Sequence, residues 1–297
     1  MAGLLRKKAE DDEIQPLIER IHSTALDNSL DPLVASTDVF VTAVLHVGSK
    51  SLSHVLAAIE RTKDRLADAG AASEEARTQI LVSVIEYWSA QPGVALCIIE
   101  KLLNYGILTP ETVINWALNT HAGATRGEAL ARSYVYELVF NTVMKVTGRV
   151  RQVVNKAATG TLEEAVDQNG NKLNPAETET KDMRVLFKTI EDALIAWASG
   201  AKDELIEVAD NEDGSKSERE AMVQRWGERW LKVFRRRAAI EEAYLIEMAK
   251  QKEKNEASAA AEAENKGKEV ESGEGVQNGA ASADADAGNA MVTEDVA

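Results

Sequence analysis

The chain has 297 residues, of which 44% are hydrophobic and 28% charged, so it can bury a large core and has the composition of an ordinary globular protein. Its 34 basic and 49 acidic residues give a formal net charge of -15 at pH 7, which opposes broad, non-specific attraction to nucleic-acid phosphates and anionic lipid. A single cysteine excludes a disulfide framework or thiolate metal cluster within the chain and favours a reducing setting. No uncharged stretch approaches the roughly 20 residues of a membrane span, so we expect neither secretion nor membrane insertion.

Apolar residues recur with helical spacing from about residue 12 to residue 155, and strand patterns are essentially missing. We expect a flexible N-terminus at residues 1–11, in which the basic cluster Arg6 to Lys8 is solvated charge rather than a nuclear import signal. Helices are predicted at residues 12–26, 36–47, 49–69, 73–90, 92–105, 110–118 and 127–158. They should pair as antiparallel helical hairpins.

The clearest hairpin signal lies between residues 94 and 118. Gly106 can take the left-handed conformation that ends a helix, Thr109 can accept the first N–H groups of the next helix, and Pro110 suits its first turn. Cys97 has apolar neighbours in the first helix, so we expect a small buried residue rather than an exposed nucleophile.

The second half of the chain continues the helical pattern. The helix at residues 127–158 carries a valine stripe with spacings of four and three, which predicts a buried face: Val135, Val139, Val143, Val146, Val150 and Val153. A surface excursion is expected near residues 159–174, where Thr161 to Glu164 can cap one short helix. A helix at residues 175–199 and a polar loop near residues 210–216 follow.

The longest predicted helix begins at residue 217 and runs past residue 248. Its spacing predicts one buried face made of Met222, Trp226, Trp230, Val233, Ile240 and Tyr244. Residues 12–250 should therefore form one helical-repeat domain. Residues 251–297 are expected to be a disordered acidic tail, because this segment is too poor in large apolar residues to offset its ordering entropy.

A search for catalytic or metal-binding groups yields no candidate. The histidines His22, His46, His54 and His121 are scattered, and although His46 and His54 bracket a predicted turn, no acidic group supports a metal site there. No nucleophile with a base beside it stands out. We expect a non-enzymatic protein without a cofactor.

One basic stripe is the candidate site for a partner or for RNA: Arg225, Arg229, Lys232 and Arg236, at spacings of four, three and four. The competing interpretation is a solvated face that Glu228, Glu241, Glu242 or the acidic tail balances. Similarly, Trp88 and Trp116 can be read as stacking platforms for bases, but aromatic residues in apolar helix stripes are more often core.

Three segments carry a resemblance to a known family: residues 38–66 (DVFVTAVLHVGSKSLSHVLAAIERTKDRL), residues 94–118 and residues 132–154 (RSYVYELVFNTVMKVTGRVRQVV). From residue 14 to residue 248 the chain resembles the large subunit of the nuclear cap-binding complex, fungal-type or similar. The likeness is to the last of its three helical-repeat domains, which are of the initiation-factor-4G middle-domain type. It implies an all-α, HEAT-like stack of antiparallel helical hairpins.

The same resemblance implies a function as a scaffold subunit in the nucleus. In that family the large subunit holds a small subunit with an RNA-recognition motif, and this partner binds the 5′ cap, so contact with capped RNA is indirect. The implied processes are splicing, 3′ processing, export and nonsense-mediated decay of mRNA, with other RNA-processing proteins as further partners. The alternative is a generic helical-repeat adaptor that docks proteins and has no direct RNA role.

Overall fold

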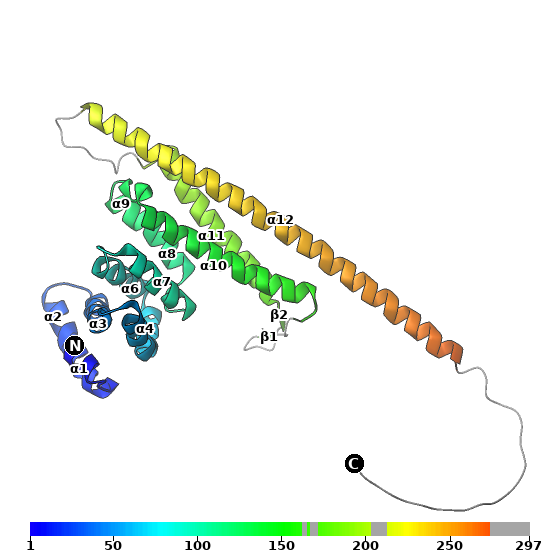
Figure 1. Ribbon diagram of the computed structural model, residues 1–297, viewed down its shortest axis with the longest axis horizontal. Helices are drawn as coiled ribbons and strands as arrows, with labels where there is room; N and C mark the ends of the chain where they lie inside the picture. Colours follow the sequence, from blue (N-terminus) through cyan, green and yellow to red (C-terminus); the bar gives the residue numbers. More distant parts are fainter. Residues whose placement is uncertain (162–164, 167–171, 203–212, 274–297) are drawn as a thin grey trace, which may run out of the picture. The chain divides into compact units, whose positions relative to one another are not determined.

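The computed structural model describes residues 1–161, 165–166, 172–202 and 213–273, and it divides into two units, residues 1–248 and 249–297. The first unit begins with α1 (Ala2–Arg6), α2 (Asp11–Asp27), α3 (Pro32–Gly48), α4 (Leu52–Arg61), α5 (Lys63–Ala72), α6 (Glu74–Tyr87) and α7 (Pro92–Asn104) (Figure 1). Helix α3 contacts α2, α4 and α6, and α6 contacts α5, α7 and α8. The expected stack of helices is confirmed.

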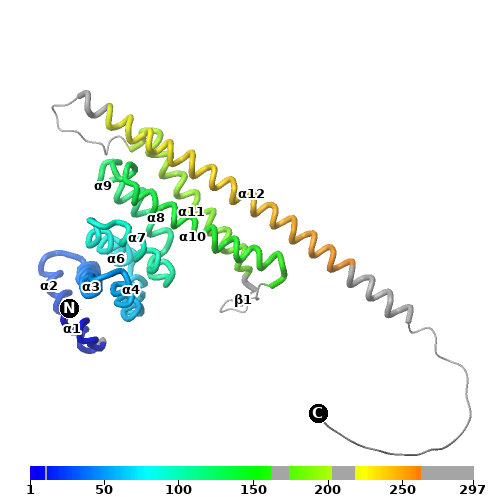
Figure 2. Tube along the Cα trace, in the orientation of Figure 1, coloured from blue at the N-terminus to red at the C-terminus, as the bar shows by residue number. Residues whose placement is uncertain are grey.

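The chain continues through α8 (Pro110–Asn115), a π-helical turn (Trp116–His121), α9 (Ala122–Ala124) and a short 3₁₀ turn (Glu128–Ala131). Three long helices follow: α10 (Ser133–Ala158), α11 (Pro175–Ala198) and α12 (Asp213–Gly273). Figure 2 traces α10, α11 and the first part of α12 as neighbouring helices. Side-chain contacts among all three helices, described below, show that they pack together. Among the residues that the structure describes, no helix is long and apolar enough to cross a membrane.

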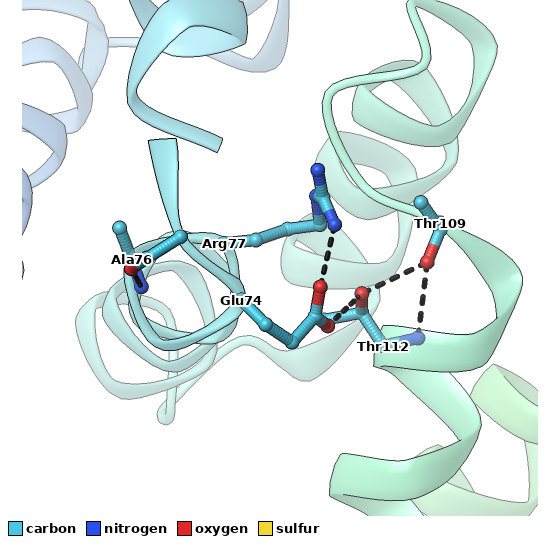
Figure 3. A network of polar contacts seen from close by, with 6 residues as sticks. Glu74, Ala76, Arg77, Thr109 and Thr112 are labelled. Atoms are coloured by element: carbon cyan, nitrogen blue, oxygen red, sulfur yellow. Dashed lines mark hydrogen bonds and ion pairs between the residues drawn. The ribbon is translucent and has the colours of Figure 1, made fainter. Parts of the chain in front are cut away.

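The turn between α7 and α8 forms as its residues predict. Gly106 adopts a positive φ of 70°, and the Thr109 side chain accepts a hydrogen bond from the Thr112 N–H at 3.2 Å. The Thr112 hydroxyl donates to Glu74 at 2.5 Å, and Glu74 also pairs with Arg77, so the first turns of α6 and α8 are tied together (Figure 3). Capping groups local to each helix thus also fix how two helices meet.

Several boundaries differ from expectation. The segment at residues 1–11 contains α1, and Leu5 is buried against the core instead of belonging to a flexible end. The helix expected at 49–69 is divided at Thr62, and the one expected at 127 begins only at Ser133, after Gly127 with φ 81°. The apolar pattern is continuous through both places, but tertiary context can override such a local preference.

The surface excursion holds one departure from an all-helical chain. Two-residue strands β1 (Ala165–Val166) and β2 (Lys172–Leu173) pair antiparallel, with Ala165 opposite Leu173. The capping residues expected at 162–164 lie outside the described residues, as do residues 210–212 of the expected loop. Helix α12 already begins at Asp213, inside the segment expected as loop.

The second unit contains the end of α12. The helix continues through residues 249–273, so the chain does not lose regular structure at residue 251 as expected. The side chains at 249–261 are all exposed, which agrees with their lack of large apolar residues. Residues 274–297, the remainder of the expected tail, lie outside the described residues.

Candidate partner-docking surface

The inner face of α12 is a regular seam. We name as the inner seam the residues Val223, Gly227, Trp230, Phe234, Arg237 and Glu241, which follow one another at spacings of four and three. The Trp230 ring packs edge-on against the Tyr136 ring of α10, with ring centroids 5.1 Å apart. The Phe234 ring packs in the same way against Phe187 of α11, with centroids 5.2 Å apart. A Cβ on Gly227 would lie 2.9 Å from the Ala198 nitrogen, so a glycine here lets α12 lie close against the end of α11.

Charged side chains also join this region of α12 to α10 and α11. Glu241 is only 2% exposed and accepts hydrogen bonds from Arg151 of α10, at 2.7 Å from Nε and 3.2 Å from a terminal nitrogen. Arg237 reaches the same carboxylate at 2.5 Å and donates to the Thr147 hydroxyl at 3.3 Å. On the other side, Arg235 pairs with Glu191 of α11 at 2.7 Å.

The face predicted for α12 is partly wrong. Trp230 is buried and Trp226 and Tyr244 are half-buried, but Met222, Val233 and Ile240 are 39%, 47% and 47% exposed. The inner seam is shifted by one position from the predicted set, to Val223, Phe234 and Glu241. Both sets have helical spacing, so periodicity does not choose between them.

The predicted basic stripe lies on the outer side of α12, and all four of its side chains are exposed. The Arg225 Nε donates to the Ala221 carbonyl of its own helix at 3.0 Å, and the Arg229 guanidinium lies 5.2 Å from the centre of the Trp226 ring. In the part of the chain that the structure describes, no ion pair joins a carboxylate to Arg225, Arg229, Lys232 or Arg236.

Two of the carboxylates expected to balance the stripe are used elsewhere. Glu241 is held by Arg151 and Arg237, and Glu242 pairs with Arg184 of α11 at 2.6 Å. The arginines of α12 that face α10 and α11 therefore have partners, whereas those of the basic stripe face solvent. Glu241 and Glu242 therefore do not balance the stripe.

The exposed apolar residues of α12 lie beside this stripe and next to α10. Val233 lines a small apolar cavity together with Tyr136 and Phe140 of α10. Tyr136 is itself 36% exposed. Periodicity within α12 alone gave no signal for these α10 residues, because only the packing of two helices brings them to the same surface.

The remaining candidates do not form a chemical site. His46 lies 3.2 Å from an Arg6 nitrogen and 3.4 Å from the Tyr87 hydroxyl, and His54 bonds to Ser51 on its own turn. Among the described residues, no group of three histidines, cysteines or carboxylates could hold a metal ion.

The two tryptophans considered as stacking platforms both pack against other rings of the protein. Trp116 is 5% exposed and stacks on the His121 ring with centroids 4.5 Å apart. Burial, with a smaller contribution from the Arg132 charge, holds the pKa of His121 below its ordinary value of 6.5. Trp88 is half-buried beside Tyr87. Trp116 has no free face for a base, so the core interpretation holds for it.

The expectation of a buried Cys97 is wrong, because this thiol is exposed. The buried residues of α7 are Ala95, Leu96, Ile98, Ile99 and Leu102. With roughly 100° of rotation per residue, Cys97 lies on the opposite side of the helix from their mean direction. Apolar neighbours in sequence did not indicate a shared face.

The profile of a protein family described as MIF4G like matches residues 1–243, which is most of the first unit. The chain belongs to the MIF4G-like family. This assignment agrees with the stacked helices seen from α2 to α12 and confirms the predicted fold type.

Several curated relatives of this MIF4G-like chain are named as forms of nuclear cap-binding protein subunit 1. The chain is similar to nuclear cap-binding protein subunit 1-A of Xenopus laevis, with 23% identity over 235 residues that cover 67% of this chain and 29% of the relative. Subunit 1 of Gallus gallus is 24% identical over 155 residues, which cover 50% of this chain and 19% of the relative. Subunit 1 of Schizosaccharomyces pombe is 28% identical over 123 residues, which cover 41% of this chain and 15% of the relative. The chain thus matches less than a third of the length of these relatives.

Proposed function

We propose that this protein is a non-enzymatic scaffold subunit of a nuclear cap-binding complex. The observation that carries the proposal is the MIF4G-like match over residues 1–243, together with relatives named nuclear cap-binding protein subunit 1. Its partner is a small subunit with an RNA-recognition motif, and its contact with capped RNA is indirect. It acts in the nucleus, in the processing, export and decay of mRNA.

The mechanism is preorganisation by a rigid surface. A partner that binds a stiff helical stack loses less conformational entropy at the interface than one that must order a flexible chain. The buried Glu241 with its two arginines, and the close contact at Gly227, support such stiffness where α12 packs on α10 and α11. The basic stripe is the part of this surface proposed to dock a partner.

The test uses the full chain and the purified small subunit. Binding is measured by biolayer interferometry, and a fluorescent 7-methylguanosine-capped RNA is then titrated with each protein alone and with the mixture. We expect a dissociation constant between the proteins of about 1 μM or tighter and cap binding at least about tenfold stronger for the mixture than for either protein.

The same measurements distinguish the alternatives. Absence of binding between the two proteins overturns the cap-complex proposal and leaves a helical-repeat adaptor for other proteins. Cap affinity that is equal with and without the chain overturns the scaffold mechanism, even if the proteins bind. An uncapped RNA of the same sequence is the control for contacts to the phosphate backbone.

A further inference from the structure

A second seam runs along the exposed side of α12. We name as the outer seam the residues Met222, Trp226, Arg229, Val233, Arg236 and Ile240. Their spacing is four, three, four, three and four, which is the spacing of the core positions in a coiled coil. The seam spans about 27 Å of helix at 1.5 Å per residue. A surface of this pattern and length matches one face of a second helix.

The outer seam is only partly covered by the described residues, at the half-buried Trp226 and where Val233 borders α10, whereas the inner seam is covered by two helices. Val233 and Ile240 are each 47% exposed and Met222 is 39% exposed, whereas Trp230 and Phe234 of the inner seam are 5% and 8% exposed. The inner seam is covered by α10 and α11. Exposed aliphatic residues at core spacing are unusual on a solvated face and mark an interaction surface.

The charges of the outer seam define the partner. Arg229 and Arg236 occupy core positions, and Arg225 and Lys232 lie at the flanking positions that choose partners in coiled coils. None of the four has a carboxylate partner within the described part of the chain. The inner seam shows how such a charge is satisfied, because its Glu241 meets Arg151 across the helix interface.

We propose that the outer seam docks an acidic amphipathic helix of a partner protein. The helix places apolar side chains against Trp226, Val233 and Ile240, and carboxylates opposite Arg229 and Arg236. It lies along α12 on the side of α10, where Tyr136 and Phe140 border the same cavity as Val233. This proposal deepens the scaffold function by naming the chemistry of a partner at the basic stripe.

The alternative occupants fit the surface less well. A second copy of this chain would bring the basic stripe against itself, and like charges at an interface are repulsive. RNA would pair with the arginines, but Val233 and Ile240 offer it neither charge nor a ring, and the Trp226 ring already lies beside the Arg229 guanidinium. A helix with apolar and acidic residues uses every side chain of the seam.

The experiment measures binding of a designed peptide to the full chain without the small subunit, so its failure is distinct from failure of the cap-complex proposal. The probe is a fluorescein-labelled peptide of about 21 residues, three heptads, with Leu at core positions, Glu opposite the two seam arginines and Glu at the flanking positions. A second peptide carries Lys in place of every such Glu. Fluorescence anisotropy reports binding.

We expect the acidic peptide to bind at least about tenfold more tightly than the basic peptide. The double variant Arg229→Glu and Arg236→Glu should reverse this preference, and Val233→Ser with Ile240→Ser should weaken both peptides. Matched controls are Arg20→Glu with Lys188→Glu, and Leu26→Ser with Leu30→Ser, which alter exposed residues on other faces and should change neither affinity. Circular dichroism verifies that each variant is folded.

Three results would overturn the proposal. The first is no binding of the acidic peptide, or equal binding of both peptides. The second is binding of a fluorescent oligouridylate that the arginine variants abolish while peptide affinity stays unchanged, which assigns the stripe to RNA. The third is a dimer in light scattering that the Val233 and Ile240 variants dissociate, which assigns the seam to a second copy of this chain.

Discussion

The Glu241 carboxylate on α12 and the Arg151 guanidinium on α10 form a two-point contact, although 90 residues separate them in the chain. The carboxylate is almost fully buried, while the neighbouring Glu242 forms its pair with Arg184 at the exposed surface. The carboxylates of two adjacent glutamates on one helix therefore lie in very different environments, one buried and one exposed to solvent.

Replacement of Glu241 by Ala should destabilise the protein strongly. The change leaves Arg151 and Arg237 without their shared carboxylate, and because these side chains are 37% and 23% exposed we expect the loss of a hydrogen bond to a charged group, about 1.5–3 kcal/mol in free energy of unfolding. Glu242→Ala is the matched control, with an expected cost below about 1 kcal/mol because that pair is solvated. Urea denaturation followed by circular dichroism compares them, and equal costs would contradict this prediction.

Replacement of Trp197 by Phe tests a second link between distant segments. The indole N–H of Trp197 donates to the Leu118 carbonyl at 2.8 Å, inside the π-helical turn. Its loss removes a buried hydrogen bond and the smaller ring also gives up packing, so the change should cost about 1–3 kcal/mol. Trp88→Phe is the control, because the buried Trp88 N–H has no hydrogen-bond partner to lose. A larger cost at Trp88 would refute this assignment.

Two glycines with positive φ should respond differently to alanine. At Gly106 a Cβ would meet nothing within 4 Å, so we expect only the backbone cost of about 1–2 kcal/mol. At Gly127 it would lie 2.5 Å from a Val223 methyl carbon, and overpacking should add about 1–3 kcal/mol. Thermal unfolding of Gly106→Ala and Gly127→Ala measures the difference, and similar melting temperatures would disprove it.

Stability should depend on the protonation of His121. Its folded-state pKa lies below the ordinary 6.5, so the unfolded chain binds the proton more readily. The stabilisation is present above pH 6.5 and is lost as the pH falls from there toward the folded pKa. Unfolding free energies at several pH values should show a smaller loss in His121→Gln than in the parent protein. Parallel pH profiles would exclude this role.

The thiol of Cys97 should react in the folded protein. Because this side chain is exposed, we expect Ellman's reagent to modify it at a rate within about tenfold of that in denaturant. The matched control carries Cys97→Ser together with Ala95→Cys, which moves the thiol to a fully buried position of the same helix. That thiol should be protected, and protection of Cys97 itself would show that the assigned exposure is wrong.

Much of the fold could be predicted because its signals are local. The turn at Gly106, Thr109 and Pro110 forms as expected, since each residue acts on backbone groups within about one helical turn. Four of the six predicted stripe valines on α10 are fully buried, for a similar reason: one helix face is read from spacing alone. The candidate site was predicted only as a row of charges.

The sequence by itself determined that the chain is helical, how the turn at Gly106 and Thr109 forms, and which family the segments resemble, because capping and periodicity depend on near neighbours. Only the tertiary structure decided which of two adjacent seams on α12 is buried, and that Glu241 and Glu242 belong to Arg151 and Arg184 rather than to the basic stripe. The two ion pairs join residues 90 and 58 positions apart, and the ring contacts that bury the inner seam, Tyr136 with Trp230 and Phe187 with Phe234, also join distant segments, so no local pattern contains their energies.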